Sequence, residues 1–109
     1  MEIVNKPWGY EKIWAQTEDY VGKILFINAG HRLSKQYHEV KEETILVIKG
    51  TLSVYNEHDE IQQVLPGESF HVVPGQIHRF GATTSNVELV EVSTNHLGDV
   101  VRLEDDYRR

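Results

Sequence analysis

Apolar and polar residues alternate in short runs along most of the chain, and turn-forming residues interrupt these runs. A period of two predicts β-strands with one buried face, whereas a helix needs apolar positions three and four residues apart. Helical periodicity is weak throughout the sequence. We therefore expect strands at Tyr10–Trp14, Val21–Asn28, Lys35–His38, Thr44–Lys49, Thr51–Tyr55, Ile61–Leu65, Ser69–Val73, His78–Phe80 and Val87–Ser93.

Turn signals separate these expected strands. Gly50 suits a tight turn, residues 56–60 form a polar hairpin tip, and Pro66-Gly67 and Pro74-Gly75 break the second half of the chain. Many short strands in 109 residues predict a sandwich or a barrel, and closing the sheet also removes exposed strand edges. We expect one all-β domain over residues 1–109, a double-stranded β-helix or jelly roll.

The run EETILVIKG places a carboxylate among core residues. Glu43, Ile45 and Val47 share one face of the expected strand, and the opposite face is also largely apolar, as in a strand covered on both sides. If Ile45 and Val47 face the core, Glu43 faces it too. A buried carboxylate is costly unless it is paired, protonated or bound to a metal ion.

Potential metal ligands lie on both sides of this strand in the sequence. Gln36 and His38, two residues apart, point to the same side of a strand, and His78 follows the second Pro-Gly turn. If both segments are strands of a small barrel, these three residues and Glu43 could supply nitrogen and oxygen ligands to one divalent ion. Imidazole and carboxylate accept zinc, manganese, iron, cobalt and nickel, so the sequence does not choose among these metals.

Composition excludes several function classes. Acidic residues outnumber basic ones 17 to 11, for a net charge of -6, which argues against nucleic acid and against an anionic membrane surface. No signal peptide and no membrane-spanning apolar run is evident. The chain has no cysteine, which rules out disulfides, thiolate ligands and a cysteine nucleophile. We expect a soluble cytoplasmic protein.

The spacing of the ligand candidates resembles a known signature. The first part is G-x5-Q-x-H-x4-E-x6-G over residues 30–50, and Gly67, Pro74, Gly75 and His78 follow. This pattern resembles the two-part cupin motif, with Gln36 in a position that is usually histidine. More narrowly, KPWGYEK, AGHRLSKQYHEVKEETILVIKG, PGESFHVVPGQIHR and VVRLEDDYRR are similar to the C-terminal cupin domain of type II mannose-6-phosphate isomerases (phosphomannose isomerases).

The resemblance implies a divalent metal ion and the interconversion of mannose 6-phosphate and fructose 6-phosphate. Gln36, His38, Glu43 and His78 match the family's metal-binding positions. Many relatives carry a nucleotidyltransferase domain before the cupin, and we expect no guanylyl transfer from these residues.

Further site residues are expected from the same resemblance and from chemistry. Arg102 and Arg109 match the terminal signature and are the first choices to bind phosphate, with Arg79 and Arg32 behind them. The sequence does not identify the general base. Candidates are His71, whose strand could point it into the barrel, Lys23, Lys35 and an acid within residues 104–106.

Departures from the family pattern keep other functions open. Val73, Ala82 and Arg108 replace a usual proline, asparagine and glycine, and Thr44-Ile45 replaces a usual His-Trp pair. One alternative is a module that binds a sugar or sugar phosphate without turnover. Another is an iron oxygenase, since two histidines and a carboxylate can form a facial triad. We also expect a homodimer, with the aromatic N-terminal segment packing on the barrel or on a second subunit.

Overall fold

The computed structural model describes residues 1–107. Every regular element in that range is a strand, so the all-β expectation is confirmed. No helix that could cross a membrane occurs in that part of the chain. The strands are β1 (Glu2–Lys6), β2 (Gly9–Gln16), β3 (Tyr20–Ile27), β4 (Lys35–Tyr37), β5 (Glu43–Lys49), β6 (Leu52–Tyr55), β7 (Ile61–Val64), β8 (Ser69–Val72), β9 (Arg79–Gly81), β10 (Val87–Thr94) and β11 (Val101–Glu104).

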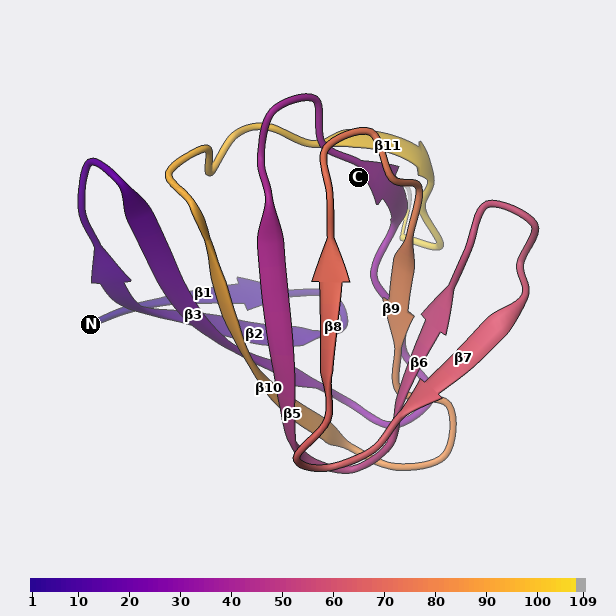
Figure 1. The fold of residues 1–109 in the computed structure, drawn as a ribbon. Coiled ribbons are helices and arrows are strands. Elements are labelled where there is room, and N and C mark those ends of the chain that lie inside the picture. Colours follow the sequence, from indigo (N-terminus) through magenta and orange to yellow (C-terminus); the bar gives the residue numbers. More distant parts are fainter. Residues whose placement is uncertain (108–109) are drawn as a thin grey trace.

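The strands form two facing sheets and one additional pair. The large sheet has the order β1-β2-β3-β10-β5-β8, the small sheet has the order β7-β6-β9, and β11 pairs with β4. In Figure 1 the two sheets approach each other at the bottom and separate toward the top, where β11 crosses the opening. Ile45 and Leu89 of the large sheet join Leu52, Val54 and Phe80 of the small sheet in one buried core. Burying these side chains is the main force that holds the sheets together.

Each expected strand corresponds to one of β2 to β10, with ends that differ by two residues or fewer. The sequence pattern missed β1 and β11. β1 has two half-buried positions, Val4 and the polar Lys6, and its other residues are exposed, so it shows little apolar alternation, and it forms by pairing antiparallel with β2. β11 has only four residues and pairs with β4, which lies more than sixty residues earlier in the chain. Both strands depend on hydrogen bonds to a neighbour rather than on their own pattern.

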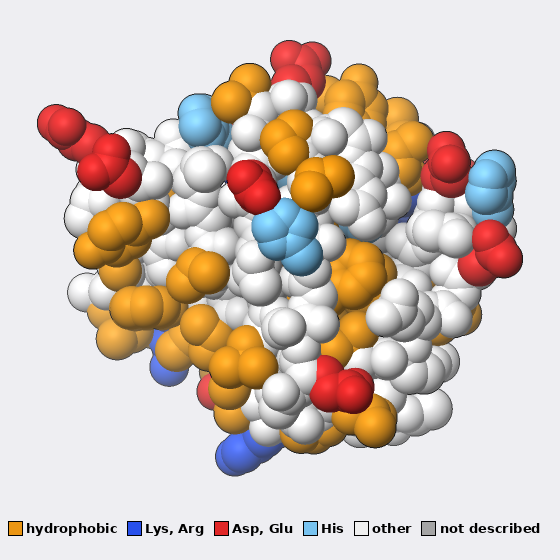
Figure 2. All heavy atoms as spheres, in the orientation of Figure 1, with side chains coloured by type: hydrophobic (Ala, Val, Ile, Leu, Met, Phe, Trp, Pro, Cys, Tyr) orange, Lys and Arg blue, Asp and Glu red, His pale blue; other side chains and the backbone are white. Residues whose placement is uncertain are grey.

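β5 is covered on one face only. Glu43, Ile45 and Val47 are buried, whereas Leu46 and Ile48 are 41 % and 43 % exposed. The expectation of a strand covered on both sides is therefore wrong for the single chain. Figure 2 shows apolar side chains gathered on this face of the molecule, where β10 and β5 run in Figure 1. The expected homodimer stays a prediction.

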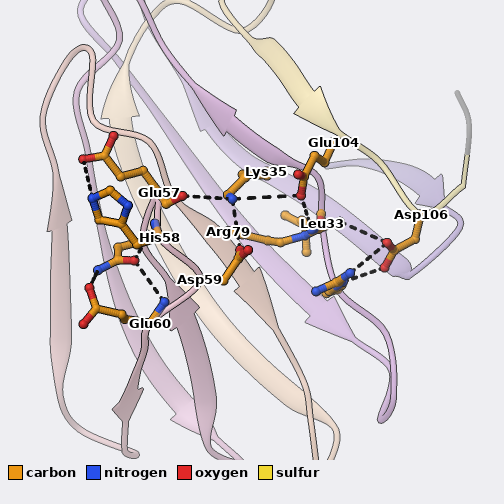
Figure 3. Close-up of polar contacts among 11 residues, drawn as sticks. Leu33, Lys35, Glu57, His58, Asp59, Glu60, Arg79, Glu104 and Asp106 are labelled. Atoms are coloured by element: carbon orange, nitrogen blue, oxygen red, sulfur yellow. Dashed lines mark hydrogen bonds and ion pairs between the residues drawn. The ribbon is translucent and has the colours of Figure 1, made fainter.

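Two arginines, the buried Arg79 and the partly exposed Arg32, fix the C-terminal segment to the barrel (Figure 3). The Arg79 side chain, 1 % exposed, donates from Nε to the Leu33 carbonyl at 2.8 Å and from Nη2 to Asp106 Oδ1 at 3.2 Å. Arg32 binds both oxygens of the same Asp106 carboxylate, at 2.6 and 3.0 Å. Charge-assisted pairs of this kind, with two parallel bonds, are geometrically specific. They hold the segment that follows β11 against the barrel.

Candidate metal centre

Three segments that are distant in the sequence carry the ligand candidates to one place. His38 directly follows β4, Glu43 begins β5, and His78 directly precedes β9. The backbones of Gln36 and His78 exchange two hydrogen bonds, of 3.0 and 2.9 Å, which join the first and last of these segments. One ligand atom each from His38, Glu43 and His78 lies within 4.8 Å of the others, and all three residues are buried. The structure therefore brings together the two imidazoles and the acid that the motif predicted.

Backbone carbonyls orient both imidazole rings. Nδ1 of His38 lies 2.6 Å from the Asp99 carbonyl oxygen, and Nδ1 of His78 lies 2.9 Å from the Gln76 carbonyl oxygen. A carbonyl oxygen can only accept, so Nδ1 carries the hydrogen in both rings. In the neutral rings each Nε2 then presents a lone pair. Both Nε2 atoms face Oε1 of Glu43, at 3.7 Å for His38 and 3.4 Å for His78.

This arrangement fits a divalent cation. Two Nε2 lone pairs and a carboxylate oxygen converge, and Nε2 of His78 is buried with no hydrogen-bond partner in the described chain. Atoms about 2.1 Å from a common ion are separated by about 3.0 to 3.4 Å in octahedral or tetrahedral arrangements, and Oε1 of Glu43 lies 3.4 Å from Nε2 of His78 and 3.7 Å from Nε2 of His38. Tying Nδ1 to a carbonyl is also the usual way that proteins orient metal-binding histidines.

The surrounding charges favour an ionised Glu43. Burial alone would raise the pKa of Glu43, but its close contacts with His38 and His78 and the charge of Lys41 hold it well below its usual range. For His38, burial acts to lower the pKa, yet the neighbouring Glu43 carboxylate and the hydrogen bond to the Asp99 carbonyl raise it overall. Glu43 is thus a carboxylate that attracts positive charge, from a proton or from a metal ion.

Gln36 lies beside this cluster and can complete it. Its Nε2 lies 3.5 Å from Nε2 of His38, while its Oε1 accepts a hydrogen bond of 2.7 Å from the Ser34 hydroxyl. A half-turn of the amide would present Oε1 to the cluster and Nε2 to the Ser34 oxygen, which can accept as well as donate. In that orientation Gln36 would be a neutral oxygen ligand.

Beyond the predicted ligands, two buried charged groups flank Glu43. Nζ of Lys41 lies 3.2 Å from Oε2 of Glu43 and 3.3 Å from Oε2 of Glu91. Burial, followed by the nearby charge of Glu43, raises the pKa of Glu91 to about 7. The sequence analysis missed both residues. Glu91 carried a signal, because strand alternation puts it on the same face as Val87 and Leu89, whereas Lys41 lies in a polar stretch that is typical of solvated loops.

The cluster opens into a pocket of about 240 Å³. Its polar wall includes Gln36, His38, Lys41, Glu43, Glu91 and Arg102, and its apolar wall includes Trp8, Leu25 and Phe80. His78 is not among the residues that line it. Arg102 stands opposite Gln36 in the β11–β4 pair, and directly paired residues share a face of the sheet. An exposed guanidinium therefore faces the same space as the ligand cluster.

Other predicted site residues lie elsewhere. The expectation that His71 points into the barrel is wrong: its side chain is half exposed, with Nε2 2.7 Å from Glu42 Oε2 and Nδ1 3.1 Å from the Thr44 hydroxyl. Its neighbours Phe70 and Val72 are the residues of that strand that pack against the core, and alternation turns His71 outward. Arg109 lies outside the described residues.

The remaining basic candidates have carboxylate partners. Arg32 and Arg79, the second choices for phosphate, both bind Asp106. Lys35 points away from the cluster, toward the Glu57 carbonyl at 3.1 Å and Asp59 at 3.0 Å. Of the proposed bases only Lys23 lines the pocket, and it is paired with Glu11 at 3.2 Å.

Comparison with known proteins relates nearly all of the described chain to one family. The family model described as "Mannose-6-phosphate isomerase C-terminal" matches residues 1–105. A mannose-1-phosphate guanylyltransferase of Sinorhizobium fredii is 31 % identical over an alignment of 107 positions, which covers 94 % of this chain and 21 % of that protein. The chain therefore spans about a fifth of the length of this curated relative.

Solved structures share the fold at lower identity. A cupin-like protein of Thermotoga maritima has a TM-score of 0.79 and 17 % identity, with 88 % of this chain and 76 % of that chain covered. A sugar phosphate isomerase of the cupin superfamily from Silicibacter pomeroyi has a TM-score of 0.71 and 16 % identity, covering 80 % of this chain and 59 % of that chain. These similarities confirm the expected cupin jelly roll.

Proposed function

The chain belongs to the mannose-6-phosphate isomerase C-terminal family, and from that premise we propose that it is a metal-dependent isomerase that interconverts mannose 6-phosphate and fructose 6-phosphate. The observation that carries the proposal is the convergence of His38, Glu43 and His78 beside a pocket that also presents Arg102. A metal-binding cluster and a cation in one pocket suit a substrate that has hydroxyl and carbonyl oxygens at one end and a phosphate at the other.

His38, Glu43 and His78 would hold the metal ion, with Gln36 as a neutral fourth ligand. When bound, a divalent cation supplies Lewis-acid stabilisation for negative charge that develops on substrate oxygens. Two imidazoles and one carboxylate leave positions for those oxygens. Lys41 holds Glu43 from the side opposite the histidines, so Oε1 stays directed at the cluster.

Arg102 would bind the phosphate. Its side chain is exposed and lines the pocket, whereas Arg32 and Arg79 are held by Asp106. A guanidinium can donate two parallel hydrogen bonds to phosphate oxygens, which fixes the orientation of the sugar as well as its position. The trapped guanidinium of Arg79 is 1 % exposed and would have to leave Asp106 to take this role.

Aldose–ketose isomerisation also moves a proton between adjacent carbons. The groups placed for this transfer are Lys41 and Glu91, which line the pocket and form an ion pair of 3.3 Å next to Glu43. Glu91, whose pKa is raised to about 7 by burial and by the charge of Glu43, could accept the proton. Burial acts to lower the pKa of Lys41, but Glu91 and Glu43 raise it overall, so Lys41 is an ammonium ion that would stabilise the ionised form of Glu91. We therefore assign the proton transfer to this pair rather than to His71.

A coupled assay with mannose 6-phosphate tests the proposal. Metal-loaded protein should form fructose 6-phosphate, and a chelator or the substitution His38→Ala or His78→Ala should abolish the reaction while the fold persists. His58→Ala is a matched control, because that histidine is exposed and its partner is the neighbouring Glu57. Binding of sugar phosphate to metal-loaded protein without turnover would instead support a binding module. Oxygen consumption with an organic co-substrate would support an oxygenase.

A further inference from the structure

We propose that Asp99 is a positioning residue that holds the metal-binding face of His38 toward Glu43. This inference rests on the proposed function only in that His38 is a metal ligand. Asp99 lies in the connection between β10 and β11, 61 positions after His38 in the chain. The cupin-like motifs of the sequence do not include it as a ligand.

Asp99 binds four consecutive residues of the β4–β5 connection. Its carboxylate accepts backbone hydrogen bonds from Glu39 at 3.0 Å, from Val40 at 2.8 Å and from Lys41 at 2.8 Å. Its own carbonyl oxygen accepts the bond of 2.6 Å from Nδ1 of His38. One residue thus satisfies three backbone donors of the loop and also fixes a side chain that the loop carries.

Both contacts matter for the metal centre. The carbonyl determines which ring nitrogen of His38 carries the hydrogen, and so leaves Nε2 free to face Glu43. The carboxylate ties that carbonyl to the loop, because both belong to Asp99. Charge-assisted bonds to backbone N–H groups are stronger than neutral ones, so the loop and the carbonyl keep their relative positions.

The same segment connects the ligand cluster to the other end of the pocket. Asp99 and Val100 line the pocket, and Arg102 follows two residues later on β11. Loss of the hydrogen bonds that the Asp99 carboxylate accepts should therefore disturb first the orientation of His38 and then the wall of the pocket. Groups that orient a ligand without touching the metal commonly change metal affinity by about 10- to 100-fold when they are removed.

Thr94 provides a matched control. Its hydroxyl accepts a backbone hydrogen bond of 3.2 Å from Glu42, in the same loop, and it does not contact His38. Thr94→Val therefore removes a tie to the loop and leaves the histidine contact intact. Asp99→Ala removes three hydrogen bonds to the loop, so the carbonyl of residue 99 is no longer held in position against His38.

The test measures the Zn²⁺ affinity of the purified proteins by competition with a metal-binding dye. Asp99→Ala should bind Zn²⁺ about 10- to 100-fold more weakly than the unaltered protein, and Thr94→Val should bind within about threefold of it. Asp99→Asn keeps one acceptor oxygen and should lie between them. This milder variant supplies the comparison if Asp99→Ala does not fold.

A second readout does not depend on metal or turnover. Long-range ¹H–¹⁵N NMR of metal-free protein at alkaline pH should show His38 with its hydrogen on Nδ1, and the Asp99 variants should shift toward the Nε2–H form. Unchanged Zn²⁺ affinity and an unchanged His38 tautomer in the Asp99 variants would overturn the inference. Weakened Zn²⁺ binding in those variants, together with no isomerase activity in the unaltered protein, would overturn the proposed reaction but leave the positioning role standing.

Discussion

Lys41 places its Nζ 3.2 Å from Oε2 of Glu43, on the carboxylate oxygen that does not face the two histidines. The same Nζ lies 3.3 Å from Glu91, so one buried cation serves two buried acids. Removing one partner of a buried ion pair leaves an uncompensated charge in the interior and is strongly destabilising. Metal binding at Glu43 would supply part of the missing charge. The stability of this region should therefore depend on both Lys41 and metal.

Lys41→Met should lower the free energy of unfolding by about 3 to 5 kcal/mol in metal-free protein. The loss should be smaller with saturating Zn²⁺, because the cation compensates Glu43. Urea denaturation with and without Zn²⁺ measures both values. Lys49→Met is the control, since that lysine is exposed, and equal losses in the two variants would contradict the prediction.

Arg102→Gln should raise the KM for mannose 6-phosphate with little change in Zn²⁺ affinity. A charge-assisted hydrogen bond contributes about 1.5 to 3 kcal/mol, which corresponds to a rise of about 10- to 100-fold. Steady-state kinetics and Zn²⁺ titration test this. Arg32→Gln should instead lower stability and leave KM nearly unchanged, because that arginine binds Asp106. The phosphate assignment fails if Arg102→Gln leaves KM unaltered.

Two glycines with similar backbone angles should respond differently to alanine. Gly50 has φ of 79° and an added Cβ would lie 2.0 Å from the Asn86 carbonyl oxygen, whereas Gly67 has φ of 86° and open space around it. Gly67→Ala should lower the free energy of unfolding by only about 1 to 2 kcal/mol, because alanine is disfavoured in the left-handed conformation. In Gly50→Ala the new Cβ must also displace the backbone at Asn86, so the free energy of unfolding should fall by more than about 3 kcal/mol. Thermal unfolding of both variants checks the order, and similar costs would contradict it.

Acid should weaken the attachment of the C-terminal segment through Asp106. The hydrogen bond from Arg32, opposed in part by burial, lowers the pKa of Asp106 below its ordinary value of 3.8. Because the pKa of Asp106 is lower in the folded state than in the unfolded state, its carboxylate stabilises the fold fully at pH values above the unfolded-state pKa. This contribution is lost as the pH falls through the folded pKa.

The stability difference between the unaltered protein and Asp106→Asn should thus be complete at neutral pH and shrink as the pH drops below 3.8. Urea denaturation over a pH series measures it. Glu2→Gln, at an exposed N-terminal position, should show no such trend. A difference that grows toward acid pH would show that the pKa shift has the opposite sign.

Local pattern was enough to predict much of the fold and part of the site. Alternation in EETILVIKG correctly put Glu43 on the buried face with Ile45 and Val47. The spacing of Gln36 and His38 likewise put both side chains beside the cluster. These predictions succeeded because strand geometry relates neighbouring positions by a fixed period.

The failures involve contacts across the chain. His71 follows the same alternation as its neighbours, but the sequence did not show which face of β8 was inside, and the buried Val72 decides it. Arg79 reads as a surface cation and is buried because Leu33 and Asp106 satisfy its donors. Asp99 had no signal at all, since its partners lie in a loop nearly sixty residues earlier.

The sequence by itself determined the strands β2 to β10, the turns between them and the residue types able to bind a metal ion, because side-chain alternation and turn preference are properties of short stretches of chain. Only the tertiary structure decided which of these residues meet. Pairing between Gln36 and His78 and the contact from Asp99 to His38 close loops of dozens of residues. The free energy of such closures comes from the whole buried core, so no single segment encodes them.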